Sequence, residues 1–378
     1  MANNLNQLIP DLYESLDIVS RELCGFIPSI TLDASAERAA LNQPIRIPVT
    51  PASDAEDVKP GQLPPDDGDQ DIGNVPLAIT KSRMVPFRWE GEQQKGIKSG
   101  PGYRGIRRDQ VTQAMRTLVN EIEVDLGQLF RRASRATGAT DKVPFEHTLT
   151  DTAQLRKILT DNGAPLSDLQ CVIDTTAGAA LRTMAQLTKA NEAGTTALRA
   201  QGTLLELHGF TLRESAGVAM HASDSAAVEK LTLENDLVPG ETVLSIKTPQ
   251  KVASPGDVLV AGNHKYLIES VPSGGGFTIL APGLREKLQK GSEVKIISKF
   301  TANFAFSRSA VILATRAPAL PEEGDMADDR IMITDPRTNM SFEVSMYKQY
   351  RRVRYEIAAA WGCQNIKPEH TAVLMGKI

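Results

Sequence analysis

Residues 335–376 of the chain read DPRTNMSFEVSMYKQYRRVRYEIAAAWGCQNIKPEHTAVLMG, and this stretch decides the fold that we expect. Apolar and polar side chains alternate over residues 341–346, with Phe342, Val344 and Met346 on one face, which predicts a strand that buries one face. Basic residues then interrupt the apolar pattern, and a second strand is predicted over residues 353–360, ended by Trp361 and Gly362. The stretch therefore predicts two strands of a sheet, and it contains no catalytic signature.

The composition is that of a folded protein with a sizeable core. The chain has 378 residues, of which 41% are hydrophobic and 23% charged, and this length suggests two or three domains. A net charge of −4 argues against a general nucleic-acid coat protein, because phosphate binding needs a clustered excess of Lys and Arg. The start lacks a signal-peptide pattern, and no apolar run reaches the roughly 18 residues of a membrane helix. We therefore expect a protein that is made in the cytoplasm and contacts no membrane.

A long hairpin arm is predicted near the start of the chain, after an amphipathic helix over residues 11–24. Strands predicted over residues 45–49 and 81–89 flank an interval rich in Pro, Gly and Asp. Arg83 and Arg88 lie at the base of this arm, and its tip carries a group of acids: Asp54, Glu56, Asp57, Asp66, Asp67, Asp69 and Asp71. Such complementary charges suit pairing with a neighbouring copy. A solvated loop that its acids keep soluble is the alternative interpretation.

A long helix is predicted over residues 107–135, because apolar side chains recur there at spacings of three and four. It would span roughly 40 Å at about 1.5 Å per residue. Arg131, Arg132 and Arg135 lie at its end, where positive charge complements the helix dipole. The sequence thus predicts one helix that is long for a compact domain of this size.

The second half of the chain changes character twice. Helices and short strands alternate over residues 151–213, which implies helices packed on a sheet. Residues 228–298 then hold six strand-like runs separated by Pro-Gly and Gly-rich turns, namely KLTLEN, TVLSIK, DVLVAG, KYLIESV, FTILAP and EVKIIS. Short strands at such spacing are typical of a small closed barrel or sandwich. We therefore expect an inserted β-domain within an α+β chain.

Two stretches resemble a known family. Residues 335–376, with a strand, an aliphatic run, WG, PE and a short apolar tail, resemble the end of tailed-phage major capsid proteins, in particular the coat-protein family of the Salmonella podophage with an inserted domain. Residues 304–322, FAFSRSAVILATRAPALPE, resemble the family segment in which a helical AVILATR run leads to the final sheet. Elsewhere the resemblance rests on the order of the predicted elements.

The resemblance implies the α+β Hong Kong phage-type major capsid fold. Its segments would be an N-arm over 1–42, an extended loop over 43–92 and a peripheral domain with the spine helix over 93–148. The axial domain would comprise 149–225 and 300–330, interrupted by an inserted β-barrel over 226–299. Residues 331–378 would complete the peripheral domain. No helical pro-region precedes these segments, so a separate scaffolding protein is implied.

The function implied is that of a major capsid protein in the virion of a tailed phage. Copies would form pentamers and hexamers of an icosahedral shell that assembles in the host cytoplasm as a procapsid and expands when DNA enters. The implied partners are other copies, a scaffolding protein, a portal and a decoration protein, with non-specific contact to packaged double-stranded DNA. No covalent crosslink is expected. The alternatives are a cargo-enclosing bacterial nanocompartment and an enzyme with an inserted barrel.

Candidate sites for chemistry are few. Five histidines without H-E-x-x-H spacing and three separated cysteines predict no metal site, no cofactor and no disulfide framework. Asp168, Asp174 and Asp335 fit helix caps or turns better than catalytic acids. In the run KQYRRVRY, Arg351 and Arg352 would line the shell interior together with Arg131, Arg132 and Arg135, while stacking on single strands is the alternative.

Overall fold

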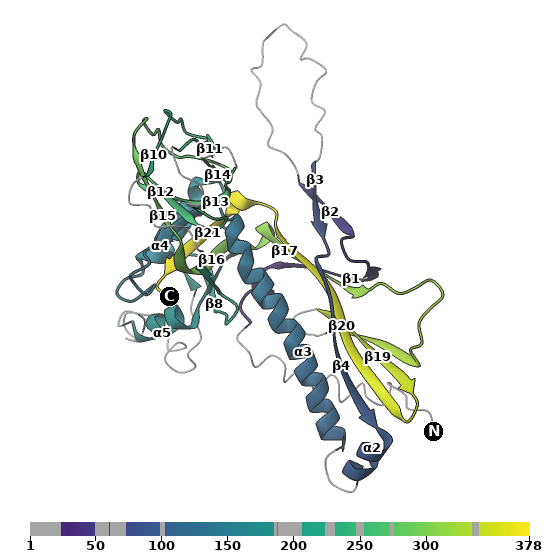
Figure 1. Cartoon of the computed structure of the whole chain (residues 1–378). Coiled ribbons are helices and arrows are strands. Elements are labelled where there is room, and N and C mark those ends of the chain that lie inside the picture. The colour runs from purple at the N-terminus through teal and green to yellow at the C-terminus, as the bar shows by residue number, and fades with distance from the viewer. Residues whose placement is uncertain are drawn as a thin grey trace.

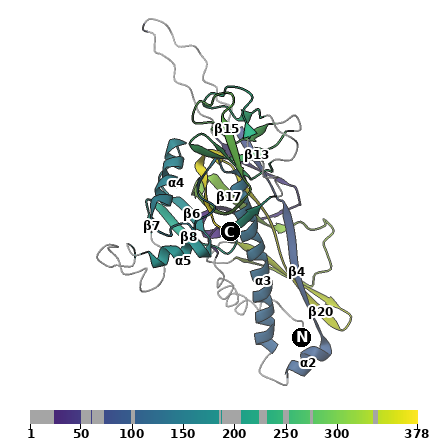
Figure 2. The same cartoon turned by 60° about the vertical axis from the view of Figure 1, so that its left-hand side comes forward.

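The fold is described from a computed structural model of residues 24–49, 60, 73–98, 103–184, 187, 206–223, 231–246, 253–272, 276–334 and 340–378. Two sheets and a long helix form its body, a small β-domain lies at one end, and a hairpin projects away from the body (Figure 1; Figure 2). The helix expected over residues 11–24 lies almost wholly outside the described residues. Short 3₁₀ turns are η2 (Ile27–Ser29), η4 (Arg308–Ala310) and η5 (Pro368–His370).

The first sheet is organised around one long strand, β20 (Arg352–Asn365). Strand β4 (Lys81–Glu90) pairs along one edge of β20, and β19 (Ser341–Gln349) and β17 (Val311–Pro318) pair along the other. Strand β18 (Asp329–Thr334) extends the sheet beyond β19, and β1 (Thr31–Ala39) pairs with β17 in parallel. The two strands predicted from residues 335–376 are therefore present as neighbours.

Three expectations for this sheet were wrong. Strand β20 does not end at Trp361 and Gly362 but continues through them to Asn365. The AVILATR run is strand β17 rather than a helix, because β1 and β20 pair with it on both edges. Strand β19 does not bury one face alone, since Glu343 and Ser345 are as buried as Phe342.

The second sheet holds the strands expected within residues 151–213 together with strands from other parts of the chain. Its central strands are β5 (Arg135–Gly138), β21 (Thr371–Gly376), β16 (Lys299–Ser307), β6 (Leu169–Ile173) and β8 (Phe210–Glu214), and β7 (Glu206–Leu207) and β9 (Ala219–Ala222) pair beside them. Helices α4 (Thr150–Asp161) and α5 (Thr175–Thr183) belong to the same region. The last strand β21 was expected to complete the unit of β19 and β20, but it pairs with β16 and β5 here.

Each of the six runs predicted in the β-domain contains a strand. These are β10 (Leu231–Thr232), β11 (Val243–Leu244), β12 (Val258–Ala261), β13 (His264–Ser270), β14 (Phe277–Ile279) and β15 (Glu293–Ile297). They pair in the order β10-β15-β12-β13-β14-β11, and a bridge joins Leu233 to Ile246. Buried apolar side chains, including Leu259, Tyr266 and Ile268, pack between them. Strand β13 also pairs with β5, so the β-domain is hydrogen-bonded to the second sheet.

The long helix α3 (Tyr103–Gly127) follows α2 (Gly91–Lys98) and packs on β4 and β20. Its predicted stripe is buried, with Met115, Leu118 and Ile122 at most 1% exposed. The helix ends earlier than the prediction of residue 135, at Gly127, and continues as η3 (Gln128–Arg132). A β-carbon on Gly127 would lie 2.1 Å from the carbonyl oxygen of Gly217, so the chain passes closely there.

The hairpin arm consists of β2 (Pro44–Val49) and β3 (Gly73–Ala78). Residues 81–89 were expected to pair with β2, but they form β4 and pair with β20 instead. The arm is anchored at its base, where Leu77, Ile79 and Ala39 are buried with Ala314 and Ala360. All seven predicted acids of its tip lie outside the described residues.

We expect Gly362→Ala to destabilise the protein strongly. A β-carbon at this position would lie 2.0 Å from the carbonyl oxygen of Ala78, and backbone cannot move aside as a flexible side chain can. The free energy of unfolding should fall by about 2–3 kcal/mol, as in other overpacked interiors. Urea unfolding of the full chain measures this loss.

The matched control is Gly73→Ala in β3, where the nearest atom, the carbonyl oxygen of Val49, lies at an ordinary 3.8 Å. If Gly362→Ala unfolds at the same urea concentration as this control, the close contact between β20 and Ala78 is not a constraint.

Candidate functional site

The basic residues predicted at the base of the arm lie on β4 rather than on the arm itself. Arg83 Nε lies 3.4 Å from Glu121 Oε1 of α3, and Lys81 Nζ lies 3.0 Å from the same oxygen and 2.8 Å from Asp125 Oδ1. These ion pairs fasten β4 to the helix. Arg88 is exposed and lies opposite Arg354 of β20. Both predicted arginines are exposed, but Arg83 also pairs with α3 whereas Arg88 lies beside another arginine.

The five arginines predicted to face a shell interior occupy three separate places. Arg131 and Arg132 are exposed on η3, beyond the end of α3. Arg131 lies over the ring of Phe130 at 6.0 Å, and Arg132 Nη2 lies 3.8 Å from Glu269 Oε1 of β13. This turn contacts β13, β16 and β20, so it joins the β-domain to both sheets.

Arg135 does not belong to any exposed surface, which corrects the prediction. It lies in β5 with 4% of its surface exposed. Its Nη1 is 3.5 Å from Asp161 Oδ2, and its Nη2 contacts Nδ1 of His264 at 2.7 Å. Burial, followed by the charge of Arg135, lowers the pKa of His264, so the imidazole can accept this hydrogen bond. Arg135 therefore fastens the β-domain to the second sheet.

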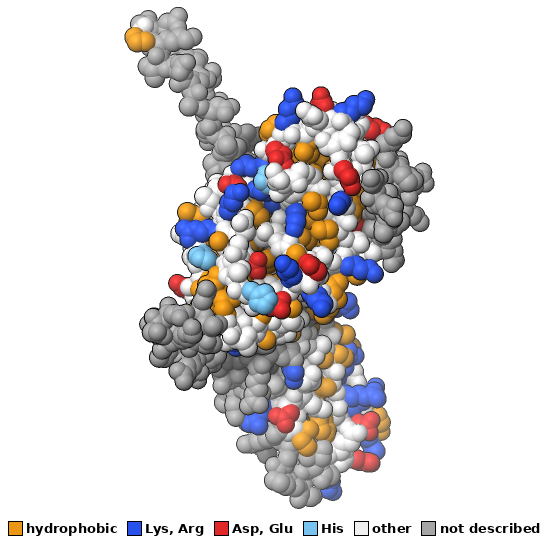
Figure 3. Space-filling model, turned by 90° about the vertical axis from the view of Figure 1, so that its left-hand side faces the viewer, with side chains coloured by type: hydrophobic (Ala, Val, Ile, Leu, Met, Phe, Trp, Pro, Cys, Tyr) orange, Lys and Arg blue, Asp and Glu red, His pale blue; other side chains and the backbone are white. Residues whose placement is uncertain are grey.

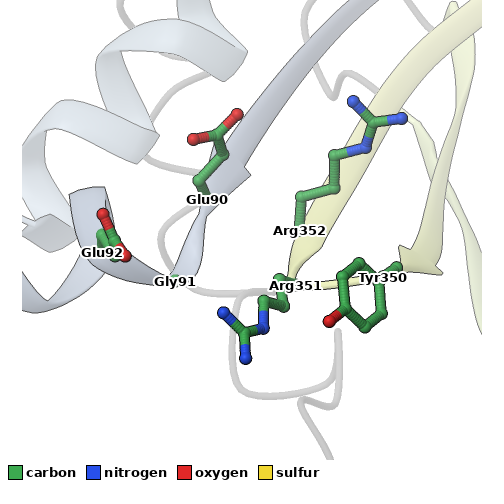
Figure 4. Close-up of a pocket in the computed structure, with 6 residues that line it drawn as sticks. All are labelled: Glu90, Gly91, Glu92, Tyr350, Arg351 and Arg352. Atoms are coloured by element: carbon green, nitrogen blue, oxygen red, sulfur yellow. The ribbon is translucent and has the colours of Figure 1, made fainter.

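Arg351 and Arg352 lie at the turn between β19 and β20, remote in the fold from η3. Together with Glu90, Gly91, Glu92 and Tyr350 they line a hollow of about 610 Å³ (Figure 4). The guanidinium of Arg351 lies 5.5 Å from the ring centre of Tyr350, which is 86% exposed. Acids and arginines both line this hollow, so its charge is mixed.

Acidic and basic side chains are interspersed over the face of the molecule that Figure 3 displays. The described part of that face carries no broad patch of a single sign. A surface of this kind suits many small polar contacts rather than one strong electrostatic field.

Candidate groups for chemistry have structural roles. Asp174 caps α5 by accepting from the backbone N–H groups of Thr176 at 3.0 Å and Ala177 at 3.3 Å. Asp168 lies 2.8 Å from Arg308 Nε, and Asp335 lies outside the described residues. No cluster of three or more metal-ligating side chains occurs in the described ranges. Among the described helices, none has the length and apolar character that crossing a bilayer requires.

Glu123 is a buried charged residue with a structural role that sequence reasoning missed. It lies on the buried stripe of α3, 3% exposed, and accepts hydrogen bonds from the backbone N–H groups of Phe26 at 2.7 Å and Ile27 at 3.1 Å and from Ser215 Oγ at 2.6 Å. One carboxylate thus ties the segment before β1 and the turn after β8 to the long helix. An acid among apolar neighbours at spacings of three and four was the available signal.

Comparisons with known proteins show the fold. No family model and no curated protein matches the chain. A chain from the capsid of the cyanophage P-SCSP1u matches with a TM-score of 0.52 and 11% identity over 94% of this chain and 89% of that one. A Mycobacterium phage Che8 chain gives 0.47 and 13% over 88% and 84%, and a virus-like particle from Pyrococcus furiosus gives 0.46 and 10% over 97% and 99%. The cyanophage match shows that this chain shares the fold of a phage capsid chain.

We expect the stability of the protein to depend on the protonation of Glu123. Burial raises the pKa of this carboxyl above its ordinary value of 4.5, despite the hydrogen bonds that favour its charged form. The folded state therefore binds more protons than the unfolded state between the two pKa values, and this contribution to stability is lost as pH rises through the raised pKa. Glu123→Gln cannot titrate, so its unfolding free energy relative to the wild type should rise over that interval and then stay level.

Urea unfolding of both proteins at a series of pH values measures this difference. Asp109→Asn, an exposed change near the start of the same helix, is the matched control. A difference between Glu123→Gln and the wild type that does not vary with pH would contradict the assignment.

Proposed function

We propose that this chain is the major capsid protein of a tailed phage and builds the icosahedral shell around its double-stranded DNA genome. The observation that carries the proposal is the shared fold with a cyanophage capsid chain over 94% of the length. The resemblance of residues 304–322 and 335–376 to tailed-phage coat proteins supports it independently. It also favours a relationship to the Salmonella podophage family with an inserted domain.

The architecture fits a mechanical role. The surfaces that the sequence singled out lie at two separate places of the fold, one on η3 and one where β4 adjoins the β19–β20 turn. In a closed shell each copy uses several such surfaces at once, and many modest contacts add up to a stable assembly. Contacts of this strength also allow a wrongly placed copy to leave before the shell closes.

The sheets suggest how the expected segments divide. We assign the first sheet and α3 to the peripheral domain, and the second sheet with α4 and α5 to the axial domain. Under this assignment β17 moves to the peripheral domain and β21 to the axial domain, which adjusts the expected segments 300–330 and 331–378. The six paired strands of residues 226–299, with the Leu233–Ile246 bridge, support a closed inserted barrel.

The partners follow from this role. We propose that copies form pentamers and hexamers in the virion, after assembly with a scaffolding protein and a portal in the host cytoplasm and expansion of a procapsid. A decoration protein would bind outside. Arg131, Arg132, Arg351 and Arg352 stay the candidates for non-specific contact with packaged DNA, whereas the buried Arg135 is withdrawn.

Expression of the chain with its scaffolding protein, followed by electron microscopy of the purified product, tests the function. Closed, uniform icosahedral shells are the expected result. Shells that form without any scaffold and enclose a specific protein cargo would favour the nanocompartment alternative. Protein that stays monomeric with and without scaffold would overturn the proposal.

Deletion of residues 52–72 tests the role of the arm. The deletion lies beyond the paired residues of β2 and β3, so we expect a folded monomer that fails to form shells. A second variant, in which the seven acids of this interval become Asn or Gln, separates charge from length. It should lose shells at physiological salt if complementary charge guides the contact. Normal particles from the deletion variant would contradict the hypothesis that the arm contacts neighbouring copies in the shell.

A further inference from the structure

The arm and β4 together present long strand edges that no other described strand covers. Strands β2 and β3 pair only with each other, and β4 pairs with β20 along one edge. Free edges of this kind expose rows of backbone N–H and C=O groups that can accept a strand from another chain. The question is which of these groups point outward.

The pairing of the arm settles this for β2 and β3. The N–H of Ile79 donates to the carbonyl of Gln43 at 3.2 Å, one step beyond the pair of Pro44 with Ala78. Bonded and non-bonded pairs alternate in an antiparallel ladder, so the next pair turns its N–H groups away from the partner strand. The outward positions are residues 44, 46 and 48 of β2 and 74, 76 and 78 of β3. Pro44, Pro48 and Pro76 occupy half of them and have no N–H.

The same reasoning applies to β4. The N–H of Gly91 donates to the carbonyl of Arg351 at 3.1 Å, next to the pair of Glu90 with Arg352. The outward N–H positions are therefore residues 82, 84, 86, 88 and 90. Pro86 stands in the middle of this row, and the N–H of Glu90 already donates to Gln93 Oε1 at 3.1 Å.

The prolines leave wide gaps between the outward N–H donors of these edges, and the gaps would weaken the pairing of an added strand. Outward donors on one edge of a strand recur about every 7 Å, and a proline widens that interval to about 14 Å. An added strand would lose a hydrogen bond at each proline and leave its own carbonyl there without a partner. Each loss costs about 1 kcal/mol, and more where the carbonyl is buried. No stretch of these edges offers more than two consecutive outward donors.

We propose that these prolines close the edges of the arm and of β4 to strand addition by a second copy, so that copies meet the arm through side chains. The partially exposed apolar face of the arm, with Ile45, Ile47, Val49 and Val75, is the surface left for such contact. The identity of the partner as a second copy rests on the proposed function. That prolines block these strand edges follows from the pairing of β2 with β3 and of β4 with β20 alone.

Pro76→Thr and Pro86→Thr each restore an outward N–H without removing a hydrogen bond, and they test the closure. Pro165→Thr, in an exposed loop before β6, is the control for replacing a proline in general. Sedimentation velocity and thioflavin fluorescence of the full chain, without scaffold, measure self-association. We expect both edge variants to shift toward larger, thioflavin-positive species, while the control sediments like the wild type.

A second variant separates edge closure from a loss of stability. Met84→Pro added to Pro86→Thr moves the proline to the next outward position. It removes no backbone hydrogen bond to β20, and it removes one weak side-chain contact, from Arg354 Nη2 to Met84 Sδ at 3.9 Å. We expect it to return sedimentation to that of the wild type. Unchanged sedimentation of both edge variants, or association of the double variant as strong as that of Pro86→Thr, would overturn the inference.

Failure of this inference is distinguishable from failure of the proposed function. The same edge variants are expressed with the scaffolding protein and imaged. If the wild type forms shells and the edge variants neither associate nor form aberrant assemblies, the capsid function stands and the closure is wrong. If the wild type forms no shells while the edge variants associate, the closure stands and the proposed function is wrong.

Discussion

The fourteen residues of β20 are the constraint on which the first sheet depends. One edge pairs with β4 from Arg352 to Trp361, and the other pairs with β19 and then with β17, which therefore lie end to end. Glu343 is buried where they meet, 2.5 Å from Arg38 Nη2 of β1 and 3.2 Å from Arg330 Nε of β18. Loss of either guanidinium would leave the buried Glu343 carboxylate with one cationic partner in place of two, which is unfavourable. The strand pairing around β20 and this ion cluster therefore stabilise each other.

The end of α3 connects this sheet to the rest of the molecule. Gly127 and Gly217 let the helix and the turn after β8 approach closely, and Glu123 satisfies backbone donors of the segment before β1. Beyond them, η3 contacts β13, β16 and β20. A shift of the helix end would therefore displace strands of both sheets and of the β-domain. A long helix joined to every layer at one end is a rigid element through which separate contact surfaces can be kept in register.

Periodicity and turn signals predicted where several elements lie, but they did not show which strands are buried on both faces. The stripe of α3, the alternation in β19 and the turn-separated strands of the β-domain were all visible in the sequence. The helix at residues 310–316 was implied by the family resemblance alone, and the structure has there strand β17, which is buried on both faces over most of its length. Strand β3 was missed because Gly73, Asn74 and Pro76 are poor strand formers, and its pairing with β2 overrides that preference. Arg135 was misplaced because charge alone does not reveal that Asp161 and His264 surround it.

Under the proposed function the chain associates with many copies, and open strand edges are then a particular difficulty. Backbone pairing is strong and sequence-tolerant, so an open edge would join copies in any register and in endless rows. Side-chain contacts are weaker individually but depend on the partner's shape and charge, which permits one arrangement and excludes others. Proline can stand only at outward positions of such strands, since an inward proline would break the hairpin itself. A proline at an outward position thus leaves the pairing within the chain intact and blocks pairing with a strand of another chain. Strands β2, β3 and β4 each carry such a proline.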